Sequence, residues 1–400
     1  MLFQVKKRVI SADVREVAAT DLAVTHLDKV VRFRWALISC WLCVVGALSA
    51  IWPGSGDWGY FRTGARALVG QPAPGTSGGI HLYASLPGIQ IGPPALLAAL
   101  PFNWLPQPWD VGVARVLMCL AVLLVLWLVD RLCQAMGVTK ARRHRGVLLG
   151  GLMLVPAWVI VAVDFTHLDD VLVLVLGTLA MLLVAKERPL WAATAVGLAV
   201  ATKPWAIVIA PVLLRSGWRP AARPVALAAG VAVAWWLPFL SDPHTLGRLW
   251  GFRLPVSLGS GLTALGLDPA VVMPGWVRPA QLLGGVLLGV VAARRGHWTG
   301  VLLVGLASRV ALDPNPMFYY GVGPVLGALV WDLTRTKTGI PWTTGFTMAA
   351  FSLTPFAGGP DTIGALRLAI CASLILYVLL RRAPRPLPIQ EIPEVEPAYV

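Results

Sequence analysis

Long apolar stretches alternate with short polar segments along most of the chain. The apolar stretches lie at residues 35–53, 111–130, 147–163, 170–185, 189–203, 204–214, 224–241, 280–293, 297–312, 318–334, 341–356 and 363–380. A helix needs about 20 mostly apolar residues to cross the hydrocarbon core of a bilayer. The pattern therefore predicts an all-α polytopic integral membrane protein, a bundle of about 12 transmembrane helices.

The composition supports a membrane protein over a soluble one. Hydrophobic residues make up 57% of the chain and charged residues only 13%, whereas a soluble domain carries about 25% charged residues. The net charge of +14 would suit a nucleic-acid partner, but the basic residues lie beside the apolar stretches, where they set membrane topology. We therefore predict a multi-pass protein of the cell membrane that contacts membrane lipids and no nucleic acid.

Lysine and arginine also orient the predicted helices. If the N-terminus is cytoplasmic and the stretches alternate, most of the 33 lysines and arginines fall on the cytoplasmic side, including the run KARRHR at 140–145. Residues 1–34 then form a cytoplasmic basic amphipathic segment, residues 35–380 the transmembrane domain, and Pro-rich residues 381–400 a disordered cytoplasmic tail. The first external loop covers residues 54–110.

Two segments fit this topology less easily. Residues 88–104 are apolar enough to cross, but a crossing there would move residues 140–145 outside, so we predict an interfacial or re-entrant helix. Residues 189–214 are too few for two crossings of about 20 residues each. We predict two short helices that meet at Lys203-Pro204, below the outer surface and beside a water-filled cavity.

On this topology the unusual polar residues gather on the extracytoplasmic side. They are Asp57, Arg62, Arg66, His81, Tyr83, residues 164–170, Lys203, residues 242–253 and residues 313–320. The cytoplasmic side carries mostly anchoring Lys and Arg, so we place the chemistry outside. GSGDWG at 54–59 matches G-x-G-x-x-G, but a nucleotide loop needs a preceding strand, and an apolar stretch precedes this one. An enzyme on that side would take an activated donor carried by a lipid.

Two segments carry a resemblance to a known family. The first runs from Asp57 to Pro106 and contains Asp, an aromatic residue, G-x-x-x-L-x-G, Leu-Tyr, Pro-Pro and Leu-Pro, at Asp57, Tyr60, Gly64, Leu68, Gly70, Leu82, Tyr83, Pro93, Pro94, Leu105 and Pro106. The second, residues 167–219, begins with HLDD and contains G-L-A-x-x-T-K-P. Both resemble GT-C glycosyltransferases, nearest the polyprenyl-phosphate-mannose-dependent family 87 of actinobacteria.

The resemblance implies a GT-C-type transmembrane catalytic domain with interfacial helices in its first external loop. It also implies transfer of a sugar, foremost mannose, from a polyprenyl-phosphate donor to a hydroxyl of an envelope glycolipid or glycan, with inversion at the anomeric carbon. Three alternatives stay open: an arabinose or other pentose donor, a lipid or polysaccharide flippase without chemistry, and a structural membrane protein. The chain departs from the family at HLDD, where Gly-Gln is frequent, and at DPNPMFYY (313–320), which lacks the late histidines.

Asp57 has two interpretations. As structure, it is the N-cap of a short surface helix over residues 58–69, because Asp is among the best N-cap residues. As chemistry, it is the general base that deprotonates the acceptor hydroxyl, since inversion needs a base opposite the leaving group. Trp58, Tyr60 and Tyr83 are then candidate aromatic residues facing the sugar, and the alternative for tyrosine is the interfacial aromatic belt.

The polar start of the second segment also has several interpretations. One of Asp169 and Asp170 is expected to cap the helix that follows. The two acids and His167 can also bind sugar hydroxyls or orient a base. We predict no metal and no other cofactor, and the alternative is a divalent metal held by these residues with Asp57.

The remaining candidates are cations. Lys203 lies in an apolar context, where lysine is costly, so we predict that it contacts the donor phosphate with Arg248 or Arg253. The alternatives are snorkelling for the lysine and lipid head-group contact for the arginines. Arg62 and Arg66 share a helical face and can also meet lipid phosphate. Arg309 is expected to pair with Asp313.

Overall fold

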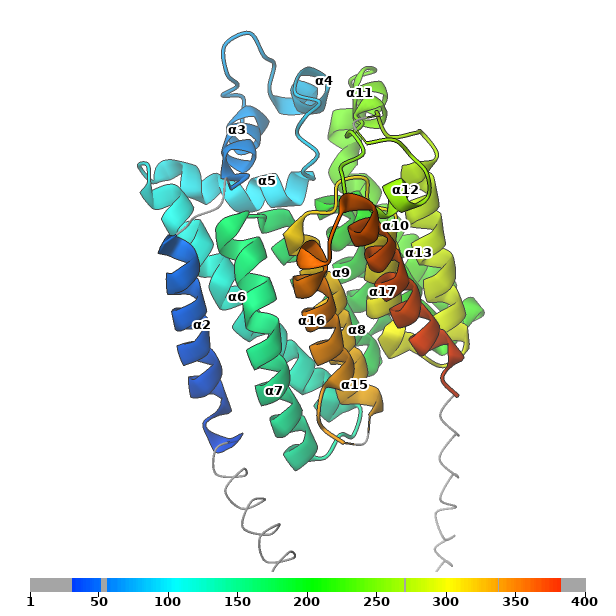
Figure 1. The fold of residues 1–400 in the computed structure, drawn as a ribbon. Coiled ribbons are helices and arrows are strands. Elements are labelled where there is room, and N and C mark those ends of the chain that lie inside the picture. The colour runs from blue at the N-terminus through cyan, green and yellow to red at the C-terminus, as the bar shows by residue number, and fades with distance from the viewer. Residues whose placement is uncertain (1–30, 52–55, 270, 337, 383–400) are drawn as a thin grey trace, which may run out of the picture.

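The computed structural model describes residues 31–51, 56–269, 271–336 and 338–382, and this part of the chain is a bundle of helices (Figure 1). Seven of the described helices are long and apolar enough to cross a membrane. They are α2 (Arg34–Ile51), α6 (Trp109–Ala135), α7 (Lys140–Val159) with its π-helical extension η3 (Ile160–Asp164), α8 (Leu168–Ala185), α10 (Trp218–Leu240), α13 (Val277–Arg294) and α17 (Pro360–Leu380). The described part of the chain is therefore all-helical, and its long apolar helices indicate a membrane protein.

The other predicted apolar stretches coincide with shorter helices. These are α9 (Pro189–Thr202), η4 (Pro204–Ser216), α14 (Val301–Ala311), α15 (Val322–Arg335) and α16 (Trp342–Leu353). Because none of them has the about 20 residues of a full α-helical span, a total of about 12 crossings stays a prediction. Most of the predicted amphipathic segment 1–34 and of the predicted tail 381–400 lies outside the described residues.

The predicted break at Lys203 is confirmed, because α9 ends at Thr202 and η4 begins at Pro204. A 3₁₀-helix rises about 2.0 Å per residue, so the 13 residues of η4 extend over about 26 Å, close to the hydrocarbon thickness of a bilayer. The 3₁₀ form thus compensates for the shortness that the sequence showed.

Glycines on α13 let η4 pack closely. A Cβ on Gly285 would lie 2.7 Å from Cγ1 of Val208, and a Cβ on Gly289 would lie 2.9 Å from Cγ of Pro211. The two glycines have the G-x-x-x-G spacing that brings one helix face near a neighbouring backbone. The two glycines therefore allow η4, which begins just after Lys203, to pack inside the bundle.

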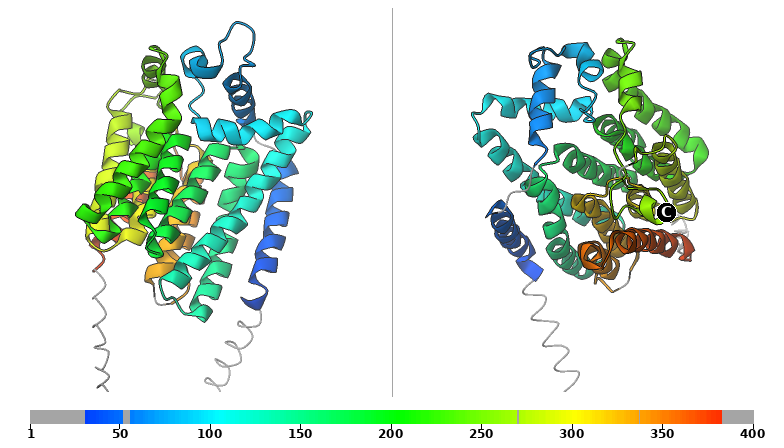
Figure 2. Two further views of the ribbon diagram at one scale, coloured as in Figure 1. Left: turned by 180° about the vertical axis from the view of Figure 1, so that it is seen from behind. Right: turned by 45° about the horizontal axis from the view of Figure 1, so that its top comes forward.

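Short helices crowd one end of the bundle, which we call the loop end (Figures 1 and 2). They are α3 (Trp58–Leu68), η1 (Gly79–His81), α4 (Leu82–Ser85), α5 (Pro93–Ala99), η2 (Leu100–Trp104), α11 (Thr245–Gly251) and α12 (Gly261–Ala264). α5 runs across the ends of the long helices (Figure 1). With only seven residues it is too short to span a bilayer, in agreement with the predicted interfacial helix.

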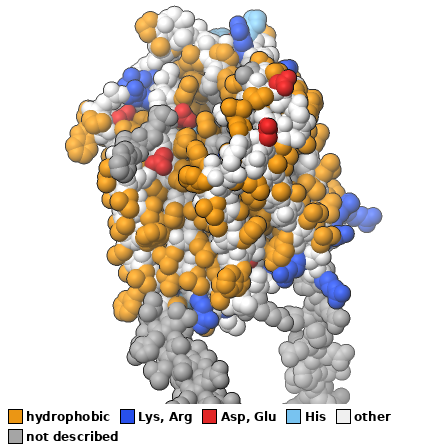
Figure 3. All heavy atoms as spheres, in the orientation of Figure 1, with side chains coloured by type: hydrophobic (Ala, Val, Ile, Leu, Met, Phe, Trp, Pro, Cys, Tyr) orange, Lys and Arg blue, Asp and Glu red, His pale blue; other side chains and the backbone are white. Residues whose placement is uncertain are grey.

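The opposite end, which we call the basic end, holds Arg142, Arg143, Arg215, Arg295 and Arg335 near the start of α7 and the ends of η4, α13 and α15. Figure 3 shows hydrophobic side chains over the middle of the visible face and charged side chains toward its two ends. Hydrophobic side chains around the middle match a lipid-facing belt. The short elements η5 (Trp298–Gly300), η6 (Phe318–Gly321) and η7 (Thr354–Phe356) join the last helices.

Candidate active site

Asp57 stands at the N-cap position of α3, but its side chain makes no capping hydrogen bond. Instead, Oδ2 of Asp57 lies 2.5 Å from Nε2 of His167. The Asp57 side chain is 39% exposed, so it meets both the protein and the solvent. The side chain of Asp57 therefore does not cap α3, although the residue holds the N-cap position.

The backbone around Asp57 explains this orientation. The Asp57 N–H donates to the carbonyl oxygen of Phe165 over 2.7 Å, which ties the start of α3 to the segment before α8. The preceding residue, Gly56, has φ +43°, and a Cβ there would lie 3.3 Å from both Nη2 of Arg115 and Oγ1 of Thr166. Only glycine fits this close approach without strain, so Gly56 is what lets Asp57 reach His167.

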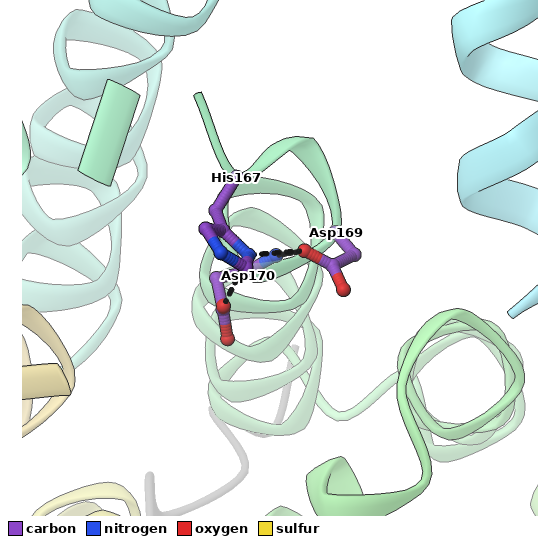
Figure 4. Close-up of side chains that lie close together, drawn as sticks. All are labelled: His167, Asp169 and Asp170. Carbon is purple, nitrogen blue, oxygen red and sulfur yellow. Dashed lines mark hydrogen bonds and ion pairs between the residues drawn. The ribbon is translucent and has the colours of Figure 1, made fainter. Parts of the chain in front are cut away.

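His167 joins Asp57 to two buried acids. Its Nδ1 lies 3.2 Å from Oδ1 of Asp169 and 3.4 Å from Oδ2 of Asp170 (Figure 4). The ring stacks on Tyr319 with 4.3 Å between centroids. The predicted capping role of an aspartate is wrong, because His167 holds the N-cap position of α8 and both acids lie in its first turn, where carboxylates favour the helix dipole.

The charge of His167 follows from these contacts. Burial alone would lower the pKa of His167, but hydrogen bonds to three carboxylates raise it from 6.5 to about 10. At neutral pH the ring is therefore an imidazolium that donates from both nitrogens. One N–H holds Oδ2 of Asp57, and the other holds the acids of α8.

Lys203 completes the network from the other side. Its Nζ lies 2.9 Å from Oδ2 of Asp169 and 2.6 Å from Oδ2 of Asp170. The lysine side chain is only 13% exposed. Its charge is thus compensated by two carboxylates, which argues against the snorkelling alternative, and the predicted contact with a donor phosphate stays a prediction.

A buried arginine lies next to this network. The guanidinium of Arg309 is held between the rings of Trp205 and Tyr320, at 4.2 Å from each centroid. Asp170 and Arg309 line the same small cavity. The predicted pairing of Arg309 with Asp313 is wrong, since the described ion pairs do not include it. The sequence does not reveal this sandwich, because its three residues lie on separate elements.

A cavity of about 460 Å³ opens beside α3. It is lined by Gly56, Gly59, Tyr60, Arg62, Thr63 and residues 85–89. Two of its glycines flank Asp57, and Tyr60 is 56% exposed. Backbone, hydroxyl, aromatic and cationic groups therefore surround a space of ligand size, and Asp57, which is not itself a lining residue, directly follows the lining residue Gly56.

Several predicted residues lie outside this arrangement. Tyr83 is fully buried and donates to the carbonyl oxygen of Ile91, so its ring packs in the core and does not face a sugar. Trp58 is 5% exposed and donates to Asp110. Among the other predicted cations, Arg62 does line the cavity and also pairs with Asp110 at 3.5 Å, whereas Arg66, Arg248 and Arg253 are exposed at the loop end and do not line it.

A contact that the sequence did not predict joins the two outer loops. Nδ1 of His81 lies 2.7 Å from Oδ2 of Asp242, which links η1 to the segment before α11. The hydrogen bond from His81, together with one from the His244 backbone, lowers the pKa of Asp242. The pair therefore fixes these two segments of the loop end with respect to each other.

One group of described side chains has the composition of a metal site: His167, Asp169 and Asp170, with ligand atoms within 4.8 Å of one another. Asp57 is not part of that group, which differs from the alternative metal set that included it. Nδ1 of His167 already donates to the acids of α8, and both carboxylates already accept from Lys203. Comparison of the sequence with known protein families and with curated proteins finds no match.

Proposed function

We propose that this chain is a membrane glycosyltransferase of GT-C type. It moves a sugar, foremost mannose, from a polyprenyl phosphate to a hydroxyl of an envelope glycolipid or glycan, with inversion. The observation that carries the proposal is the placement of Asp57, a half-exposed carboxylate held by an imidazolium beside a cavity of about 460 Å³. The sequence resemblance names the donor class.

Asp57 supplies the base for this reaction. His167 fixes Oδ2, and no described residue donates to Oδ1, which leaves that oxygen to accept the proton of the acceptor hydroxyl. The hydroxyl oxygen then bonds to the anomeric carbon as the bond from that carbon to the phosphate oxygen breaks. The lipid phosphate leaves with the electron pair, and Arg62 in the cavity wall is the nearest candidate to stabilise it.

A transfer assay tests the function. Purified protein in lipid nanodiscs is given radiolabelled polyprenyl-phosphate mannose, or the arabinose donor in parallel, with envelope glycolipids as acceptors. We expect labelled product with one donor and none with the D57N variant. Movement of the labelled donor across a proteoliposome bilayer, without product and equally in D57N, would instead identify a flippase.

We place the loop end on the extracytoplasmic side, because Lys and Arg dominate the opposite end. Cysteine labelling with an impermeant reagent tests this in a chain whose five native cysteines are replaced. Both target side chains are exposed: Arg66 at the loop end and Arg382 after α17. A cysteine at 66 should react in intact cells and one at 382 only after lysis; the reverse result would invert the topology.

A further inference from the structure

We propose that Lys203 is a built-in cation that takes the place of a divalent metal between Asp169 and Asp170. Its Nζ lies 2.6 Å and 2.9 Å from one oxygen of each acid. The two acids and His167 are the kinds of ligand that bind Mg²⁺ and Mn²⁺. The ammonium therefore occupies the position in which such an ion would be held.

Burial makes positive charge at this position stabilising, and the imidazolium of His167 supplies only one positive charge for the two acids. Asp169 and Asp170 are 1% and 3% exposed, and they are adjacent in the first turn of α8. Two buried carboxylates this close repel each other unless positive charge lies between them. Lys203 supplies that charge from a fixed place, since it lies in extended conformation between the end of α9 and the start of η4.

The lysine also controls the proposed base at a distance. Lys203 holds one oxygen of Asp169, the other oxygen of Asp169 holds Nδ1 of His167, and Nε2 of His167 holds Asp57. Without the ammonium, the imidazolium would be the cation nearest to both buried acids and would be drawn toward them. Lys203 is thus a positioning residue for Asp57 and does not touch the substrate.

The cation role is independent of the proposed function, and the positioning role rests on it. The test compares K203A, which removes charge and opens space, with K203M, which removes charge but fills the space. Mn²⁺ binding to purified protein is followed by electron paramagnetic resonance. We expect K203A to bind about one Mn²⁺ per chain, and wild type and K203M to bind none at this site.

Activity gives the second measurement. K203A and K203M should each lose about 10²-fold in transfer, the usual cost of a misplaced catalytic group. Mn²⁺ or Mg²⁺ should restore most of the activity of K203A and none of that of K203M, and K203R should retain activity. Absence of Mn²⁺ binding by K203A, or binding by wild type that D170N abolishes, would overturn the proposal.

A double variant covers the case in which K203A does not fold. D170N removes one negative charge, so K203M with D170N restores the charge balance that K203M alone destroys. We expect the double variant to recover part of the thermal stability lost in K203M, whereas additive losses would contradict the counter-ion role. If Mn²⁺ binding follows the expected pattern but no form transfers sugar, the proposed function fails and the cation role stands.

Discussion

The two ends of the bundle use cations in different ways. At the basic end, four arginines donate to backbone carbonyls near the C-terminal ends of helices, and a fifth, Arg143, pairs with the buried Asp130. Arg142 donates to Leu333 over 3.0 Å, and the remaining contacts of this kind run from Arg215 to Val184, from Arg295 to Leu379 and from Arg335 to Gly296. Each positive charge lies near the C-terminal end of a helix, where the dipole favours it.

At the loop end, the cations face carboxylates instead. His167 and Lys203 hold Asp57, Asp169 and Asp170, and one of those carboxylates stays half exposed beside a cavity. A carbonyl bound to arginine has no further chemistry to perform, but a carboxylate with a free oxygen can accept a proton. The comparison shows that residue type alone does not tell whether a charged side chain stabilises the fold or belongs to a functional site. Its partner and its exposure to solvent make that distinction.

The largest effect is expected at the exposed member of the loop-end network. D57N keeps the shape of the side chain but removes its basicity, so transfer should fall by about 10²–10⁴-fold. Thermal stability should stay near that of wild type, because the side chain caps no helix. D268N, an exposed acid between α12 and α13, is the matched control and should be fully active. If D57N kept wild-type transfer activity, Asp57 would not be the base, and the loop end would differ from the basic end only in structure.

The next effect is expected at the basic end and concerns stability only. Arg143 pairs with the buried Asp130 over 3.0 Å. R143M leaves that acid unpaired, and removing one partner of a buried ion pair costs about 3–5 kcal/mol. The turnover number of the folded protein should not change, because the pair is remote from the cavity. The measurement is denaturant unfolding together with the transfer assay, with exposed K140M as control. A lower turnover number would link the two ends.

Alkaline pH should act on the loop end through His167. Its pKa is raised from 6.5 to about 10, so the charged ring stabilises the fold fully below about 6.5 and loses this contribution as pH rises through about 10. Transfer should fall about 10-fold for each pH unit above that value. H167Q cannot titrate, and its residual activity should lack this alkaline limb. If wild type and H167Q both lost activity at alkaline pH in the same way, the loss would be due to a group other than His167.

The smallest effect is expected for a single capping arginine. R142M removes the hydrogen bond to Leu333 and should cost about 1 kcal/mol in unfolding free energy. Activity should match wild type. The double variant R142M/R143M should lose more unfolding free energy than either single variant. Its turnover number in the transfer assay should stay that of wild type.

The sequence by itself determined the helical membrane class and most helix positions. Apolar stretches of membrane length are visible without any tertiary contact, because each must satisfy its own backbone hydrogen bonds within lipid. The break at Lys203-Pro204 was also predictable, since proline and a lysine in an apolar run both oppose a continuous span. The candidates Asp57, His167 and Lys203 stood out for the same reason, as polar groups next to apolar ones.

Only the tertiary structure decided what those residues contact. Asp57 and His167 are 110 positions apart, and no local pattern reveals that their side chains meet. The same holds for the compensation of Lys203 by two acids of α8 and for the arginine held between Trp205 and Tyr320. The physical reason is that hydropathy acts along the chain, whereas the pairing of buried charges depends on which helices the bundle brings together.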